Sequence, residues 1–190
     1  MFRKKTFSKQ NMEIKNMKKL LFLTCLLAFA ANCLFAANEA IKPEGEGTAE
    51  SPYVLTRIEN LVWMNNNMRS CQSSVFCLGN DIDASETAGW ETQFVPIGSA
   101  KTSTGKSYNF KGVLDGKNFA IKNLYSRNSG LILHWEGAVI KNLYLENVNF
   151  GRRYAGINKS GGLTPECNDS VITNVHVSGK IKGTFEVGGI

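Results

Sequence analysis

Three aspartates are the residues whose chemistry could make this 190-residue chain an enzyme. Asp81 and Asp83 follow the apolar stretch 75–78, and Asp115 precedes a glycine. Polysaccharide lyases and glycosidases need several carboxylates on one face, where they bind calcium or act as acid and base. However, Asp-Gly is typical of a tight turn, and aspartates after a strand often accept backbone hydrogen bonds. We therefore expect no catalytic residue, no metal site and no cofactor, with a polysaccharide-active enzyme as the alternative.

The two histidines carry no recognised catalytic pattern. His134 stands beside Trp135 in a predicted loop, and neither His134 nor His176 is paired with a nearby Ser or Cys in a known order. The sequence contains no HExxH motif, no paired CxxC motif and no phosphate-binding loop. These observations indicate a protein that is not an enzyme.

An aromatic stripe is the candidate binding feature. Tyr125, Tyr144 and His176 occupy the same position in three copies of a short phrase, next to a residue expected to point inward. In stacked coils about 4.8 Å apart, they would form an outward stripe flanked by Lys122 and Lys141. Aromatic faces with nearby donors suit a glycan or a cell-surface protein. The alternative is a stacking ladder that only stabilises the sheet surface.

The phrase itself predicts the architecture that would position this stripe. Ile-Lys-Asn-Leu-Tyr at 121–125 returns intact at 140–144, and a looser copy follows at 172–176. Gly-Leu pairs at 130–131 and 162–163 each precede an Ile of the phrase by ten positions. A solenoid needs such repetition, because each coil buries its apolar edge only against a neighbour with the same edge. We predict an all-β fold, a right-handed β-helix or solenoid.

The asparagines of the repeat are expected to bend the chain. The apolar residues of 140–150 cannot all face inward on one straight strand, and a bend at Asn142 and again at Asn147 restores the alternation. Asparagine tolerates the left-handed conformation that such bends use. Its amide can also bond to the same residue one coil above, so Asn123, Asn142 and Asn174 are predicted to stack as a ladder.

The domain organisation follows from these segments. Residues 37–52 are polar and glycine-containing, and predict a flexible lead-in. Residues 53–109 predict an N-terminal cap with one helix, begun by a capping box from Thr56 to Glu59, and the first strands. Residues 110–190 predict the coils, and the final Gly-Ile resembles the opening of another unit, so we expect more coils beyond it.

Residues 1–36 are expected to be a signal peptide. Two lysines precede an apolar run at 20–31 and a small-residue exit, which is the pattern of a secretory leader. Met17 is then a plausible start. The run is shorter than the roughly 20 residues needed to span a bilayer, so we expect no transmembrane span. The predicted location is outside the cell or on its surface, with lipidation at Cys33 as the less favoured route.

The net charge belongs to the leader. The chain has 22 basic and 16 acidic residues, a formal charge of +6. Seven of the basic residues and one of the acidic residues lie in 1–36, which leaves 15 of each in the remainder. A balanced domain gives no support for nucleic-acid binding, which needs a basic face on the folded part.

Two cysteines are candidates for a disulfide. Cys71 and Cys77 are close enough in sequence to close a small loop in an oxidising compartment. The alternative is that both, together with Cys167, are small buried apolar residues.

Taken together, several motifs resemble one family. They are Gly-x-Gly-Thr-x-x-x-Pro-Tyr at 45–53, Asn-Asp-Ile-Asp at 80–83, Pro-Ile-Gly at 96–98, Phe-x-Gly-x-x-Asp-Gly at 110–116, and the repeated Ile-x-Asn-Leu. Residues 44–190 thereby resemble bacterial secreted proteins with the GLUG motif, which are predicted β-solenoids of cell-surface proteins. Some accompany surface peptidases that cleave immunoglobulin A, where the repeats are not the catalytic part. The fourth motif position, usually Gly, is Leu133 in one copy and Pro165 in the other.

The resemblance implies a fold and a location and does not identify a ligand. The favoured function is non-enzymatic adhesion or display at the cell surface. A polysaccharide-active enzyme and the stalk of a larger surface hydrolase are the alternatives.

Overall fold

The computed structural model describes most of the chain after the leader. The described ranges are 39–99, 101–128, 130–151, 159–165, 167–183 and 186–189. All of them belong to one compact unit, Asn38–Ile190. The predicted signal peptide, its alternative start at Met17 and the predicted lipidation site Cys33 lie outside the described residues.

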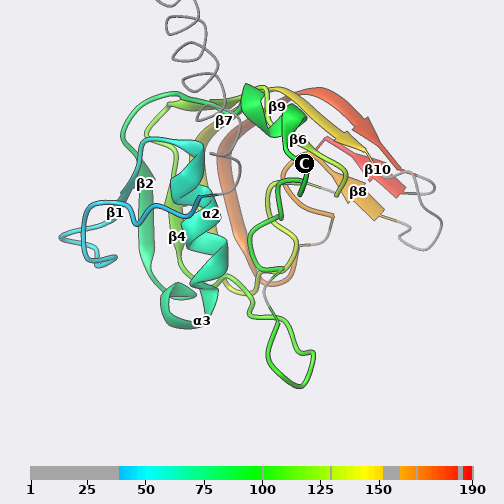
Figure 1. Ribbon diagram of the computed structural model, residues 1–190. Coiled ribbons are helices and arrows are strands. Elements are labelled where there is room, and N and C mark those ends of the chain that lie inside the picture. Colours follow the sequence, from blue (N-terminus) through cyan, green and yellow to red (C-terminus); the bar gives the residue numbers. More distant parts are fainter. Residues whose placement is uncertain are drawn as a thin grey trace, which may run out of the picture. The chain divides into compact units, whose positions relative to one another are not determined.

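The described part is mostly β-strand, with one large parallel sheet and few helices (Figure 1). The 8-stranded sheet contains β1 (Tyr53–Leu55), β2 (Val75–Leu78), β3 (Ile82–Asp83), β4 (Val113–Asp115), β5 (Ala120–Lys122), β6 (Tyr125–Ser126), β7 (Val139–Gly151) and β9 (Val171–Lys182). A 2-stranded sheet pairs β8 (Lys159–Gly161) with β10 (Glu186–Gly188). The helical elements are α2 (Ile58–Asn66), α3 (Met68–Cys71) and the 3-10 helix η1 (Ser85–Gly89). The predicted all-β class is therefore confirmed.

Strand β7 organises the large sheet. It pairs in parallel with β4, β5 and β6, which follow one another along the chain, and over most of its length with β9. Figure 1 shows β2, β4 and β7 side by side in this order. Each pass of the chain therefore lies beside the next pass in the same direction.

The core is built from apolar columns that run across these strands. In register, two of the columns are Phe76–Leu114–Ile140–Ile172 and Ile82–Ile121–Leu145–Val177. A third column begins with the buried Ser126 and continues through Phe150 and Ile181. Their members in β2 to β7 are buried, whereas the β9 members are half-buried. Within the described ranges β9 pairs with a large-sheet strand on one side only, which explains this difference.

The segments that connect the strands stack in the same order. Ile97 bridges Ile132 in parallel, and the backbone N–H of Ile132 donates to the carbonyl oxygen of Leu163 at 2.9 Å. Phe110 bridges Trp135, which is 2% exposed. The buried residues of the sheet, of these segments and of α2 form one hydrophobic cluster.

Left-handed residues bend the long strands where the apolar spacing required it. Asn142 has φ 52° and Asn147 has φ 51°, and in β9 Asn174 has φ 51°. At its second bend, β9 has Ser178 and then Gly179 at φ 135°. A Cβ on Gly179 would lie 2.1 Å from the carbonyl oxygen of Val148, so this close approach requires glycine.

Helix α2 forms where the sequence predicts it, but another residue caps it. The side-chain oxygen of Asn60 accepts hydrogen bonds from the backbone N–H groups of Thr56 at 3.0 Å and Arg57 at 3.3 Å. Asn60 therefore does what was predicted for Glu59, because the helix begins one residue later than expected. Within the described residues, none of the helices has the length and hydrophobicity needed to cross a membrane.

Hydrogen bonds join the lead-in, predicted flexible from its composition, to the first strands. The N–H of Val54 donates to the carbonyl oxygen of Glu44 at 2.8 Å, and the N–H of Val75 donates to that of Gly47 at 2.8 Å. Gly47 has φ 79° and faces the ring of Tyr53, so a side chain at this position would collide with that ring.

The predicted disulfide is wrong, because Cys71 and Cys77 are both free thiols. Cys71 lies in the core, where its Sγ donates to the carbonyl oxygen of Met64 at 3.6 Å. Cys77 lies between Phe76 and Leu78, which enter the core, so strand alternation turns its side chain to the other face of β2. Burial raises the pKa of Cys71 to about 11 and also raises the pKa of Cys77. Both thiols therefore stay protonated and unreactive at neutral pH.

Candidate ligand-binding site

A pocket of about 380 Å³ opens beside the second bend of β7. Helix η1, the corner between β5 and β6, and strands β6, β7 and β9 build its walls. The lining residues are Ser85, Ala88, Asn123, Tyr125, Asn147, Val148, Asn149 and Lys180. We refer to it as the corner pocket. It combines one aromatic ring, three side-chain amides and one lysine, a set that can bind hydroxyl and carboxylate groups.

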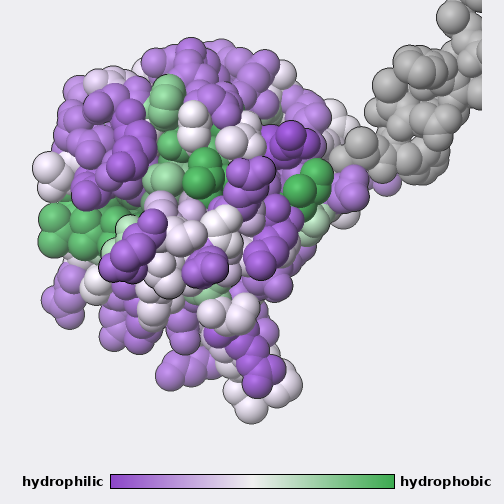
Figure 2. Space-filling model, turned by 90° about the vertical axis from the view of Figure 1, so that its left-hand side faces the viewer, coloured by the Kyte–Doolittle hydropathy of each residue, from purple (hydrophilic) through white to green (hydrophobic). Residues whose placement is uncertain are grey.

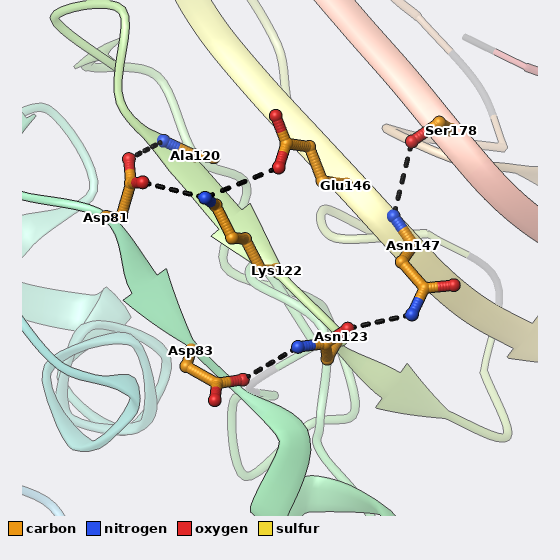
Figure 3. Close-up of polar contacts among 8 residues, drawn as sticks. All are labelled: Asp81, Asp83, Ala120, Lys122, Asn123, Glu146, Asn147 and Ser178. Atoms are coloured by element: carbon orange, nitrogen blue, oxygen red, sulfur yellow. Dashed lines mark hydrogen bonds and ion pairs between the residues drawn. The ribbon is translucent and has the colours of Figure 1, made fainter.

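A column of hydrogen bonds fixes two of those amides (Figure 3). The Nδ2 of Asn123 donates to Oδ1 of Asp83 at 3.0 Å, and the Nδ2 of Asn147 donates to Oδ1 of Asn123 at 2.8 Å. The backbone N–H of Asn147 donates to Oγ of Ser178 at 3.2 Å. The bond from Asn123 and a second one from the Ser85 N–H lower the pKa of Asp83. The carboxylate therefore stays ionised and holds the amide column in place.

An ion triad lies next to this column (Figure 3). The Nζ of Lys122 lies 2.8 Å from a carboxylate oxygen of Asp81 and 3.5 Å from one of Glu146. The backbone N–H of Ala120 donates to Asp81 at 2.9 Å. The hydrogen bond from Lys122 lowers the pKa of Asp81, and Asp81 in turn raises the pKa of Lys122. Lys122 therefore pairs with two acids instead of flanking an aromatic stripe.

A second column of amides lies at the first bend. The Nδ2 of Asn142 donates to Oδ1 of Asp115 at 3.2 Å, and the Nδ2 of Asn174 donates to Oδ1 of Asn142 at 3.1 Å. Asn174 also donates to Oδ1 of Asn118 at 3.3 Å. Lys141, the other predicted flanking lysine, lies 3.4 Å from Asp115. Asn142 and Asn174 thus stack as the ladder requires, but Asn123 belongs to the other column.

The predicted aromatic stripe is divided between two places. Tyr144 is in register with His176, and their rings stack with centroids 4.8 Å apart and planes 7° apart. Tyr125 is instead in register with Asn149 and lines the corner pocket. Lys180, which lines the corner pocket together with Tyr125, was not among the residues predicted from the sequence. It is exposed and directly follows the left-handed Gly179, and this position after the predicted bend is the signal that could have found it.

The three candidate carboxylates are each engaged in structural contacts. Asp83 and Asp115 begin separate amide columns, and Asp81 pairs with Lys122. Across the described ranges, no group of three or more His, Cys, Asp or Glu side chains is placed to hold a metal ion. The site chemistry is therefore that of hydrogen-bonded amides beside an aromatic ring.

From the hydrogen bonds of Asp115, we expect the stability of the folded protein to depend on pH. Burial would raise the pKa of Asp115, but hydrogen bonds from the Lys117 N–H and the Asn142 amide, together with Lys141, outweigh burial and lower it. A folded-state pKa below the unfolded value of about 3.9 gives stability that is present above pH ~4 and lost as pH falls through the folded value.

We therefore expect the melting temperature of the wild type to fall below pH 4, and to fall less in Asp115→Asn than in the wild type. Circular dichroism melts at pH 7, 5, 4 and 3 measure this. Glu50→Gln, at an exposed position, is the matched control and should follow the wild type. An equal decrease of the melting temperature between pH 7 and pH 3 in Asp115→Asn and in the wild type would contradict the role given to this carboxylate.

Comparisons with known proteins give one family match and two relatives. The family described as the M26 IgA1-specific metallo-endopeptidase N-terminal region matches residues 49–179. Halomucin from Haloquadratum walsbyi is 32% identical over 162 residues, covering 77% of this chain and 2% of halomucin. Immunoglobulin A1 protease from Streptococcus sanguinis is 38% identical over 88 residues, covering 46% of this chain and 4% of the protease.

The chain thus spans only 2% and 4% of the length of these two relatives. No solved structure matches it. The matched range begins before β1 and ends within β9, so it contains nearly the whole parallel sheet. On this match, the chain belongs to the family of M26 IgA1-specific metallo-endopeptidase N-terminal regions.

Proposed function

We propose that this chain is a non-catalytic, exported region of a cell-surface protein, which supports and spaces the parts that act. The observation that carries the proposal is the family match over 49–179, a range that coincides with the stacked parallel sheet. We therefore assign the supporting role to the stacked parallel sheet. The use of Asp81, Asp83 and Asp115 in ion pairs and amide columns supports a role without catalysis.

The architecture in this proposal is a right-handed β-helix. Val139 and Val171 are register partners, which makes the coil between them 32 residues long (171 − 139). The connecting segments at Ile132 and Leu163 are joined by a hydrogen bond, which supports one full turn of the chain between them. Right-handed crossover is the strong preference for parallel strands. The Gly-Leu pairs at 130–131 and 162–163 lie in these segments, which supports the GLUG interpretation.

Export rests on the leader in the sequence. The basic start and short apolar run of 1–36 support secretion, and Cys33 offers lipidation as a second route to the surface. A supporting stalk of a surface hydrolase fits the family better than free adhesion, because the family is named for the N-terminal region of a peptidase.

The experiment follows export and catalysis in one set of strains. The full chain and a form without residues 17–36 are produced in a bacterium, and intact cells are treated with added protease. We expect only the full chain to be reached by the protease. We also expect neither form, purified and supplied with Zn²⁺, to cleave immunoglobulin A1. Cleavage that a chelator abolishes would contradict the non-catalytic role, and protection of the full chain inside cells would contradict export.

A second candidate function is glycan binding at the corner pocket. The position of Tyr125 in the wall of this pocket favours it. Tyr125 is half-buried, the column holds the Asn123 and Asn147 amides in place, and Lys180 adds a cation. A ring face beside fixed amides suits a sugar, and the lysine favours an acidic one.

We expect Tyr125→Ala to weaken glycan binding at least tenfold on an array and in titrations with the best binder. Tyr144→Ala is the matched control, because Tyr144 stacks on His176 outside the pocket. Loss of binding in Tyr144→Ala but not in Tyr125→Ala would place the site on the Tyr144–His176 pair instead. A silent array for the wild type would reject this second candidate.

A further inference from the structure

The outer face of the sheet after the second bend carries cations and no acids. Strand β7 lies between β6 and β9 here, and the column that begins at the buried Ser126 enters the core. Strand alternation therefore turns the residues before and after each member of that column outward. The six outward positions are Tyr125, Asn149, Lys180, Arg127, Gly151 and Lys182. We refer to these six residues as the basic face.

The three positive charges of the basic face are not neutralised by neighbouring acids. Arg127, which directly follows β6, and Lys180 and Lys182 are all exposed. None of the three forms an ion pair within the described part of the chain, whereas Lys122 and Lys141 on other parts of the sheet do. The side of the molecule that carries β1 and β2 has another character, because hydrophobic patches interrupt its hydrophilic surface (Figure 2). The basic face is therefore the part of this sheet that is free to attract an anion.

The register places the three cations close enough to act on one ligand. Lys180 and Lys182 are two residues apart on β9, which is about 7 Å at the usual rise of a strand. Arg127 and Lys182 are separated by β7, so their backbones are about 10 Å apart at the usual strand spacing. Gly151 has no side chain to stand between them, and a Cβ there would lie 3.5 Å from Cδ of Lys182. These separations are comparable to the Debye length of about 8–10 Å, so the three charges attract an anion together.

The basic face also continues into the corner pocket, which can recognise a sugar ring. Tyr125 and Lys180 belong to both, and the pocket adds the amides of Asn123 and Asn147, which their hydrogen bonds hold in place. An aromatic ring, side-chain amides and cations together suit a sugar that carries a carboxylate. The face has one aromatic ring and no aliphatic side chain, whereas protein interfaces are centred on an apolar core. These features favour a glycan over a protein as the ligand.

Each exposed cation contributes little to binding by itself, because water and salt screen it. A polymer with a regular series of carboxylates can contact all three cations at once, and its affinity increases with the number of contacts. We propose that the basic face binds a linear acidic polysaccharide, which runs across β6, β7 and β9 and places one of its rings in the corner pocket. The inference rests on the glycan-binding function proposed for that pocket, and it extends the site to Arg127 and Lys182.

The test measures the binding of two polymers to the full chain by isothermal titration calorimetry, at low and at high salt. The polymers are polygalacturonate and its fully methyl-esterified form, which have the same backbone and differ in charge. We expect saturable binding of polygalacturonate at low salt, and at least tenfold weaker binding at high salt because salt screens the cations. We also expect the ester to bind at least tenfold more weakly than polygalacturonate at low salt.

Two variants locate the contact on the basic face. The double variant Lys180→Gln with Lys182→Gln should weaken polygalacturonate binding at least fivefold, and Arg127→Gln should weaken it at least twofold. The matched control is the double variant Lys101→Gln with Lys106→Gln, which makes the same change of charge at exposed lysines outside the basic face. This control should bind like the wild type. Circular dichroism spectra identical to that of the wild type confirm that each variant is folded.

The outcomes separate this inference from the glycan-binding function on which it rests. Equal binding of the ester, or unchanged polygalacturonate binding in the folded Lys180→Gln, Lys182→Gln chain, would overturn the inference and leave a neutral glycan as the ligand of the corner pocket. Equally tight binding of polyglutamate would also overturn it, because the face would then recognise charge without recognising sugar. Absence of binding to any glycan would reject the glycan-binding function as well. None of these outcomes bears on export or on immunoglobulin cleavage.

Discussion

Ile140→Ala should lower the free energy of unfolding by about 2–5 kcal/mol, the range for removing most of a buried Ile side chain. Ile140 is fully buried and lies in the middle of an apolar column, between Leu114 of β4 and Ile172 of β9. Its loss leaves a cavity that touches two neighbouring strands, so neither strand can close it alone. Urea unfolding at pH 7, followed by circular dichroism, measures the change.

Ile172→Ala is the matched control for this prediction. It removes the same atoms from the same column, but Ile172 is half-buried because β9 pairs with β7 on one side. Less apolar surface is lost, so the decrease should be clearly smaller than for Ile140→Ala. Equal decreases for the two variants would contradict the stacking order β4–β7–β9.

Asn142→Leu should destabilise the protein by about 2–4 kcal/mol. Asn142 has φ 52°, and a leucine in the left-handed region costs about 1–2 kcal/mol more than a residue that tolerates it. The substitution also removes the hydrogen bonds to Asp115 and from Asn174, at about 1–2 kcal/mol in this half-exposed setting. The same urea experiment measures the change.

Two companion variants separate the causes. Asn142→Gly keeps the left-handed bend and loses only the amide bonds, so it should cost less than Asn142→Leu. Asn149→Leu makes the same change on β7, at an exposed residue outside the left-handed positions, and should have little effect. A cost for Asn149→Leu as large as for Asn142→Leu would show that side-chain polarity on β7, and not the bend, is responsible.

The bends are the part of the fold that the sequence predicted best. The apolar residues of 140–150 could face inward only if the strand turned at Asn142 and Asn147, and both residues are left-handed in the structure. The helix before the strands and the all-β class also followed from short-range patterns. These features depend on residues close together in the chain, which is why one sequence was enough to predict them.

The register between strands was not predictable from the repeated phrase. Leu114 pairs with a residue 26 positions later (140 − 114), whereas Ile121 pairs with one 24 positions later (145 − 121). The corner between β4 and β5 is therefore two residues longer than the corresponding bend of β7. This shift moves Asn123 beside Asn147 and Tyr125 beside Asn149, so identical five-residue phrases are not neighbours in space.

The disulfide prediction failed for a related reason. Spacing along the chain allowed Cys71 and Cys77 to meet, but the alternation of 75–78 turns Cys77 away from the core that contains Cys71. The corner pocket was also missed, because it gathers residues from segments that only the folded chain brings together. Tyr125 and Lys180, which both line it, are far apart in sequence.

Cysteine cross-linking tests the central claim, the parallel stacking in this register, most directly. Neighbouring strands lie about 4.8 Å apart, within the Cα separation that a disulfide spans. Tyr125→Cys combined with Asn149→Cys should form a disulfide under mild oxidation, identified by mass spectrometry of the linked peptides. Tyr125→Cys combined with Tyr144→Cys, the pair that the repeated phrase aligns, should stay reduced. A link in the second variant and none in the first would contradict the account.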